Sequence, residues 1–193
     1  MRRYIFTSVE FAFKTLKRSH QQSGDLFQQR SPKVFEGAPS INVNSVKYFI
    51  GYVDTNDMNF ESEKRKFSSL KGYLSSKLAQ VMVSSILQKN LPDGSGISVV
   101  CVAPGSGLRS TPFAATDSDV PKYCTKLKTD VWPVCAYMSY SCNKMSTSKE
   151  AHRTDTLQAV WEKTLDMVRL PADFVEMLLQ GKEIQCWYGA HPN

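Results

Sequence analysis

The feature that most constrains the fold is a helical segment followed closely by a short apolar run. In residues 73–91, apolar side chains recur at spacings of three and four, which is the period of an α-helix. A Pro-Asp-Gly turn at residues 92–94 ends that pattern, and residues 97–103 then form a β-branched run bounded by glycine and proline. So short and apolar a run is typical of a strand that is buried on both faces of a parallel sheet.

A second candidate strand precedes the helix. Residues 41–46 alternate apolar and polar side chains and include β-branched residues. Strand, long helix, tight turn and strand make one β-α-β unit, which places the two strands parallel. The predicted fold class is therefore α/β. Further along, we expect a strand within residues 131–137, a helix over residues 154–168, and a last helix from Pro171 to Leu179 that Gly181 closes.

The distribution of charge bears on possible partners. The chain has a formal net charge of +6, and residues 1–30, with six Lys or Arg against two Asp or Glu, contribute +4 of it. The remaining residues are close to neutral and lack the interleaved aromatic and basic residues of single-strand-binding proteins. We therefore expect no nucleic-acid partner.

Residues 1–37 form a basic segment that we expect to be poorly ordered, ahead of one folded domain over residues 38–193. The basic segment also resembles an organelle transit peptide in composition. Five cysteines without a C-x-x-C pair, and no secretory leader, favour a reducing intracellular compartment, either the cytoplasm or an organelle such as a plastid or mitochondrion. We expect no membrane span, because no apolar run is long enough, and no metal site, because the three histidines are far apart.

The candidate chemistry lies at the start of the long helix. Tyr73 and Lys77 are four residues apart, which places the phenol and the ammonium on one helix face, one turn apart. A neighbouring cation favours the phenolate form of a tyrosine, as a proton donor and acceptor near neutral pH requires. Ser45 follows the upstream strand and Pro104-Gly105 follows the downstream strand, so both lie at the carboxyl edge of the predicted sheet.

Three segments in this order carry a family resemblance. They are Asn42-Val43-Asn44-Ser45-Val46, Tyr73-Leu74-Ser75-Ser76-Lys77-Leu78-Ala79 and Val99-Val100-Cys101-Val102-Ala103-Pro104-Gly105. Together they resemble the short-chain dehydrogenase/reductase family, in its retinol-dehydrogenase-like branch. The tail, with Trp132-Pro133-Val134-Cys135 and Tyr188-Gly189-Ala190-His191, is similar to plant oxidoreductases of the forever young type. The resemblance implies the C-terminal part of a Rossmann-like parallel sheet with flanking helices, incomplete because its first half is not found.

The same resemblance implies a role for each site residue. Tyr73 would exchange a proton with a small alcohol or carbonyl substrate, and Ser45 would hydrogen-bond the substrate oxygen. Lys77 would hold the nicotinamide ribose and lower the pKa of Tyr73. Tyr73, Lys77, Pro104 and Gly105 would together contact the nicotinamide end of NAD or NADP.

One expected feature of the family does not occur in the sequence. No G-x-x-x-G-x-G turn for the cofactor pyrophosphate lies before Ser45. The segment Gly-Ser-Gly-Leu-Arg-Ser at residues 105–110 approaches a phosphate-binding pattern, but we expect Thr111-Pro112 to prevent a helix from starting there. We therefore interpret residues 105–110 as an altered loop.

Two functions follow from these observations. The first is an NAD(P)-dependent oxidoreductase of the short-chain type that acts on an alcohol or carbonyl, with weak or no activity as this truncated chain. The alternative is a non-catalytic remnant or interaction module derived from that family. An exposed apolar sheet edge would also allow the chain to self-associate.

Overall fold

The fold is built on a three-stranded parallel sheet. A computed structural model describes residues 39–60, 62, 68–105, 109–130, 134–180, 182 and 184. The strands are β1 (Pro39–Val43), β2 (Ser98–Val102) and β3 (Ala136–Met138), in that spatial order. Ile41 pairs with Val100 across β1 and β2, and Cys101 pairs with Tyr137 across β2 and β3. The parallel β-α-β unit and the α/β class predicted from the sequence are thus confirmed.

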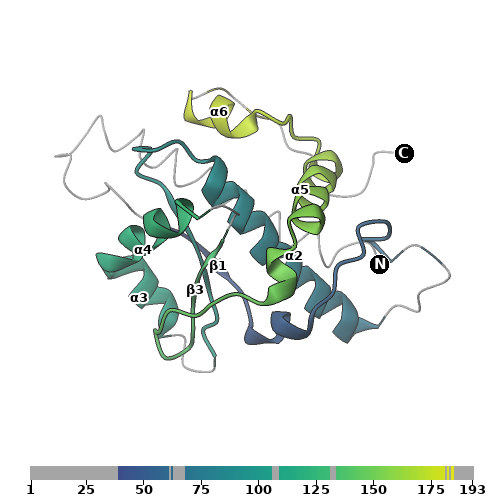
Figure 1. Cartoon of the computed structure of the whole chain (residues 1–193), viewed down its shortest axis with the longest axis horizontal. Helices are drawn as coiled ribbons and strands as arrows, with labels where there is room; N and C mark the ends of the chain where they lie inside the picture. Colours follow the sequence, from purple (N-terminus) through teal and green to yellow (C-terminus); the bar gives the residue numbers. More distant parts are fainter. Residues whose placement is uncertain are drawn as a thin grey trace.

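Helices cover both faces of the sheet (Figure 1). On one face, α2 (Ser69–Asn90) packs against β2, and α5 (Thr154–Val168) packs against α2. On the other face, α3 (Ser110–Thr116) contacts β1 and α4 (Asp119–Lys128) contacts β2. The short helix α6 (Phe174–Leu179) follows α5, and two 3-10 helices, η1 (Val46–Ile50) and η2 (Lys149–His152), lie in the connections. Every residue of β2 is buried, as expected for the central strand of a covered parallel sheet.

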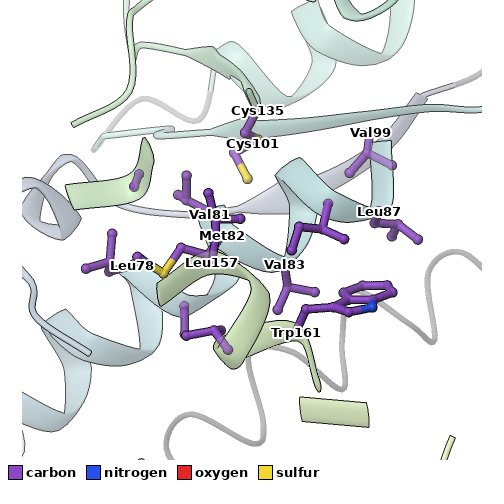
Figure 2. Packing of buried hydrophobic residues seen from close by; sticks show 14 of the residues in the cluster. Leu78, Val81, Met82, Val83, Leu87, Val99, Cys101, Cys135, Leu157 and Trp161 are labelled. Carbon is purple, nitrogen blue, oxygen red and sulfur yellow. The ribbon is translucent and has the colours of Figure 1, made fainter. Parts of the chain in front are cut away.

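The larger part of the core lies between the sheet, α2 and α5 (Figure 2). Leu78, Met82 and Leu157 are among its fully buried side chains. A smaller cluster on the opposite face joins β2 and β3 to α3 and α4 through Val100, Val102, Ala114, Val120, Cys124, Ala136 and Met138. Because α2 lies between the sheet and α5, apolar residues are needed around much of its circumference.

Two element boundaries differ from the prediction for a local reason. The long helix begins at Ser69 rather than residue 73, because the Ser68 hydroxyl accepts a hydrogen bond from the backbone N–H of Lys71 and caps the first turn. The first strand ends at Val43 rather than residue 46. There the Ser45 hydroxyl accepts from the N–H of Lys47 and starts η1, so Val46 belongs to a 3-10 helix.

The expectation that Thr111-Pro112 would prevent a helix was wrong, because α3 begins at Ser110. Pro112 lies in the first turn of α3, where backbone N–H groups have no partner within the helix. A proline there removes no helical hydrogen bond, so the helix tolerates it. Residues 106–108, between β2 and α3, lie outside the described residues.

The C-terminal elements agree in type with the sequence and differ in their ends. The helix α5 matches its predicted range, and β3 lies partly within the predicted 131–137, of which residues 131–133 are outside the described residues. The last helix begins at Phe174 rather than Pro171, because the Pro171 carbonyl instead closes a turn by accepting from the Phe174 N–H. The described part of the chain contains no helix that is both long and apolar enough to cross a membrane. The predicted segments 1–37, Gly181 and Tyr188–His191 lie outside the described residues.

Candidate functional site

The end of β1 positions Ser45. Asn44 continues the ladder to β2 through its backbone N–H, which donates to the Val102 carbonyl at 2.7 Å. Ser45 then leaves the sheet, with its N–H donating to the Asn44 Oδ1 atom at 2.7 Å and its hydroxyl capping η1. Its hydroxyl is therefore engaged by the backbone of Lys47 at 3.3 Å, a long and exposed hydrogen bond.

Tyr73 and Lys77 lie one turn apart on the first half of α2, as their spacing predicts. The Lys77 Nζ atom is 5.9 Å from the centroid of the Tyr73 ring, within the range of a cation–π contact. The same Nζ atom donates to the Val43 carbonyl at 3.0 Å. Lys77 therefore joins the tyrosine to the end of the strand that carries Ser45.

Pro104 and Gly105 follow β2 at the same edge of the sheet. Gly105 has a φ of 58°, in the left-handed region that favours glycine. A Cβ atom added there would lie 2.9 Å from the Cβ of Tyr140, so a side chain would also collide with the turn after β3. The sharp turn after β2 thus depends on this glycine.

The structure therefore connects Ser45 with Lys77 through Val43 and Asn44, and Lys77 with Tyr73 directly. That the Ser45 and Tyr73 hydroxyls lie within reach of one another, directly or through one water, stays a prediction. Pro104 and Gly105 follow β2, the strand paired with β1, and their contact with a nicotinamide also stays a prediction.

Two buried residues beside the site were not assigned a role from the sequence. The Tyr137 hydroxyl donates to the Asn44 Oδ1 atom at 3.3 Å, and its ring packs against Tyr48 with centroids 4.9 Å apart. Burial raises the pKa of both phenols above the usual value for tyrosine. Both tyrosines therefore stay protonated at neutral pH; the Tyr137 hydroxyl bonds Asn44 beside the site, whereas the Tyr48 hydroxyl accepts from the Ser148 N–H. In the sequence, the one sign that a buried polar partner was needed here is Asn44, a polar residue within a strand-like segment.

The described cysteines do not form a metal centre. Cys101, Cys124 and Cys135 are buried free thiols, Cys142 is partly exposed, and Cys186 lies outside the described residues. Burial raises the pKa of the Cys124 thiol to about 12. Over the described ranges, no group of three or more His, Cys, Asp or Glu side chains could hold a metal ion.

No family model matches the chain, but two curated proteins are similar to it. The chain belongs to the short-chain dehydrogenase/reductase family. It is 47% identical, over 190 residues, to the dehydrogenase/reductase SDR family member FEY of Arabidopsis thaliana, covering 82% of this chain and 50% of that protein. It is 32% identical, over 95 residues, to human retinol dehydrogenase 13, covering 44% of this chain and 28% of that protein.

These matches confirm the resemblance to the retinol-dehydrogenase-like branch and to plant oxidoreductases of the forever young type. The chain spans about half the length of the first of these curated relatives. Among solved structures, it is similar to an uncharacterized protein from Mycobacterium paratuberculosis, with 22% identity, a TM-score of 0.48, and coverage of 67% of this chain and 50% of that chain.

Proposed function

We propose that this chain carries the proton-transfer half of an NAD(P)-dependent oxidoreductase site that acts on a small alcohol or carbonyl. The observation that carries the proposal is the position of Lys77, which contacts both the Tyr73 ring and the Val43 carbonyl next to the Ser45 turn. A cation held there is one turn from a partly exposed tyrosine, which is the arrangement that proton exchange with a substrate oxygen requires. Membership of the family supports an oxidoreductase reaction. That this chain is active, and that its substrate is a small alcohol or carbonyl, is what we propose.

Tyr73 and Lys77 are the residues that would hold the nicotinamide end of NAD(P), which when bound would supply hydride transfer to or from the substrate carbon. In the oxidation direction Tyr73 would act as the phenolate and take up the hydroxyl proton, becoming the phenol; in the reduction direction the phenol would give that proton to the carbonyl oxygen and become the phenolate. Ser45 orients that oxygen by hydrogen bonding, after its hydroxyl exchanges the long hydrogen bond from Lys47 for the substrate. Lys77, whose ammonium lies over the Tyr73 ring, can bond the hydroxyls of the nicotinamide ribose.

The donor set on this chain fits only one end of the cofactor. Lys77 and Tyr73 offer an ammonium and a phenol, which suit a ribose and a nicotinamide. The helix α3 follows the glycine-containing segment that begins at Gly105, but it is only seven residues long and Pro112 in its first turn has no N–H to donate, so it offers few donors to a pyrophosphate. We therefore propose that the chain alone binds NAD(P)H weakly and turns over slowly.

Titration of the purified chain with NADPH and NADH, followed by nicotinamide fluorescence, tests this function. We expect weak binding that Lys77→Ala abolishes and that Lys71→Ala, an exposed lysine on the same helix, leaves unchanged. Equal loss in the two variants would show that the lysines act only through general charge. No binding up to millimolar cofactor would instead support the alternative, a non-catalytic remnant of the family.

A specific observation favours self-association as a second property. Large apolar side chains are exposed on η1, on the loop after it and at the start of α2, including Phe49, Ile50, Tyr52 and Leu70. The helix η1 follows β1 closely in the chain and contacts α2, and β1 pairs with β2 on only one side in the described sheet. We propose that two copies of the chain cover this apolar surface together. Sedimentation equilibrium should show a dimer that Ile50→Lys dissociates and that Tyr140→Lys, at an exposed position after β3, does not.

A further inference from the structure

Asn44 is buried between the end of β1 and helix α2, and its amide uses its full hydrogen-bonding capacity. The Nδ2 atom donates to the Lys77 carbonyl at 2.9 Å and to the Gln80 Oε1 atom at 2.9 Å. The Oδ1 atom accepts from the Ser45 N–H at 2.7 Å and from the Tyr137 hydroxyl at 3.3 Å. A carboxamide has two donor hydrogens and two acceptor lone pairs, so all four are satisfied.

The end of the strand and the helix are joined by two hydrogen bonds, each from a side chain of one to the backbone of the other. The Asn44 side chain bonds the backbone of Lys77, and the Lys77 side chain bonds the backbone of Val43 at 3.0 Å. The two bonds run in opposite directions between one residue of α2 and two neighbouring residues, Val43 at the end of β1 and Asn44 directly after it. Rotation or sliding of α2 relative to the strand end would break both.

We propose that Asn44 is a positioning residue, which fixes Ser45 relative to Lys77 and hence to Tyr73. The inference rests on the proposed function, because it assigns Asn44 to the geometry of that same site. Asn44 touches the backbone of Ser45 with one end of its amide and the backbone of Lys77 with the other. Since a displacement of about 1 Å in a catalytic group can lower a rate by about 100-fold, a link of this kind controls turnover without contact with substrate.

Asn42, two residues earlier and within β1, provides a matched control. It is as deeply buried as Asn44, and its Nδ2 atom donates to the Ser84 hydroxyl at 2.8 Å. Its Oδ1 atom has no hydrogen-bond partner in the described structure. Asn42 therefore crosses from β1 to α2 without bonding Ser45 or Lys77, so its loss should affect stability more than site geometry.

The experiment compares Asn44→Ala with Asn42→Ala in the full chain. If Asn44 is a positioning residue, Asn44→Ala lowers kcat by about 10- to 100-fold with a smaller change in KM, and Asn42→Ala changes kcat by less than about twofold. The Ser45 amide, followed by NMR, exchanges with solvent about tenfold faster in Asn44→Ala, because it has lost a hydrogen bond. Chemical denaturation of both variants shows whether their stabilities are comparable.

Each remaining outcome decides the proposal. Unchanged kcat in Asn44→Ala, or an equal fall in both variants, would overturn it. If the wild-type chain has no turnover, the proposed function fails, and Ser45 exchange alone then tests the positioning: unchanged exchange in Asn44→Ala rejects it. If Asn44→Ala does not fold, Tyr137→Phe removes only the hydroxyl that bonds Oδ1, and we expect kcat to fall by about two- to tenfold. No fall in that variant would also count against the proposal.

Discussion

Gly51 offers a sharp test of how η1 is held against α2. A Cβ atom added at this position would lie 2.6 Å from the Leu74 carbonyl oxygen, 2.9 Å from the Tyr48 carbonyl oxygen and 3.0 Å from the Leu78 Cβ. The backbone of Gly51 has φ −74° and ψ 156°, which any L-residue adopts without strain. Substitution by alanine therefore acts through steric overlap alone.

The magnitude follows from what must move. Two of the three nearest atoms are backbone carbonyl oxygens, and one of them belongs to the turn of α2 that leads to Lys77. Restoring ordinary contact distances requires a backbone shift of about 0.5–1 Å between η1 and α2. Overpacking of this kind typically costs about 1–3 kcal/mol, a large share of a total stability of about 5–15 kcal/mol. We expect Gly51→Ala to lower the free energy of unfolding by that amount.

Urea denaturation followed by circular dichroism measures the change, with Gly94 as the control position. Gly94 has φ 78° and nothing within 4 Å of an added Cβ, so its substitution costs only the left-handed backbone conformation. Asparagine tolerates that conformation better than alanine. At Gly94, therefore, asparagine should lower the free energy of unfolding less than alanine does. At Gly51 the larger asparagine should lower it more than alanine does. A Gly51→Ala protein within about 0.5 kcal/mol of wild type would refute the steric argument.

Three further predictions concern the core and its buried titratable groups. Leu157→Ala, in the contact of α5 with α2, should lower the free energy of unfolding by about 2–5 kcal/mol in urea denaturation, whereas Gln158→Ala, at an exposed position of the same helix, should change it by less than about 0.5 kcal/mol. Because burial raises the pKa of Tyr48 and Tyr137, the folded state holds their protons more tightly than the unfolded state, so stability present below about pH 10 is lost as the pH rises further. In an alkaline titration followed by tyrosinate absorbance, these two phenols should ionise only together with unfolding, and a gradual ionisation in the folded state would contradict this. In a Cys186→Ser background, a thiol reagent should modify Cys142 in the native protein and the buried Cys101, Cys124 and Cys135 only after unfolding, as mass spectrometry of the modified peptides would show.

The elements that the sequence predicted best are those whose pattern follows from burial. All five residues of β2 are buried, and α2 and α5 have apolar residues at helical spacing because each packs against another layer. The helix α4 was not predicted. Its apolar positions Val120, Cys124 and Leu127 have helical spacing, but they are few and separated by charged residues. An amphipathic helix over the outer face of a small sheet needs no more apolar residues than these.

The end of β1 could not be predicted from local pattern, since side chains distant in sequence determine it. Residues 41–46 alternate as a strand does, and the strand ends at Val43 where Asn44 forms hydrogen bonds to residues 33, 36 and 93 positions away. Local propensity contains no information about such partners. Similarly, the sequence could show that Pro112 lies near a turn but not that it falls in a first turn, where proline is tolerated.

The site shows the same division between local and long-range information. The spacing of Tyr73 and Lys77 is a local property of one helix, and the structure places the two side chains together as that spacing predicts. The relation of Lys77 to Ser45 depends instead on how α2 is rotated and translated over β1, which a sequence motif does not specify. In this fold the buried amide of Asn44 and the ammonium of Lys77 set that relation through two backbone carbonyl groups. Consider a relative that retains Ser45, Tyr73 and Lys77 but has an apolar residue at position 44. It would keep the motif but lose the hydrogen bonds that align Ser45 with Lys77. The motif alone is therefore insufficient to infer an assembled site.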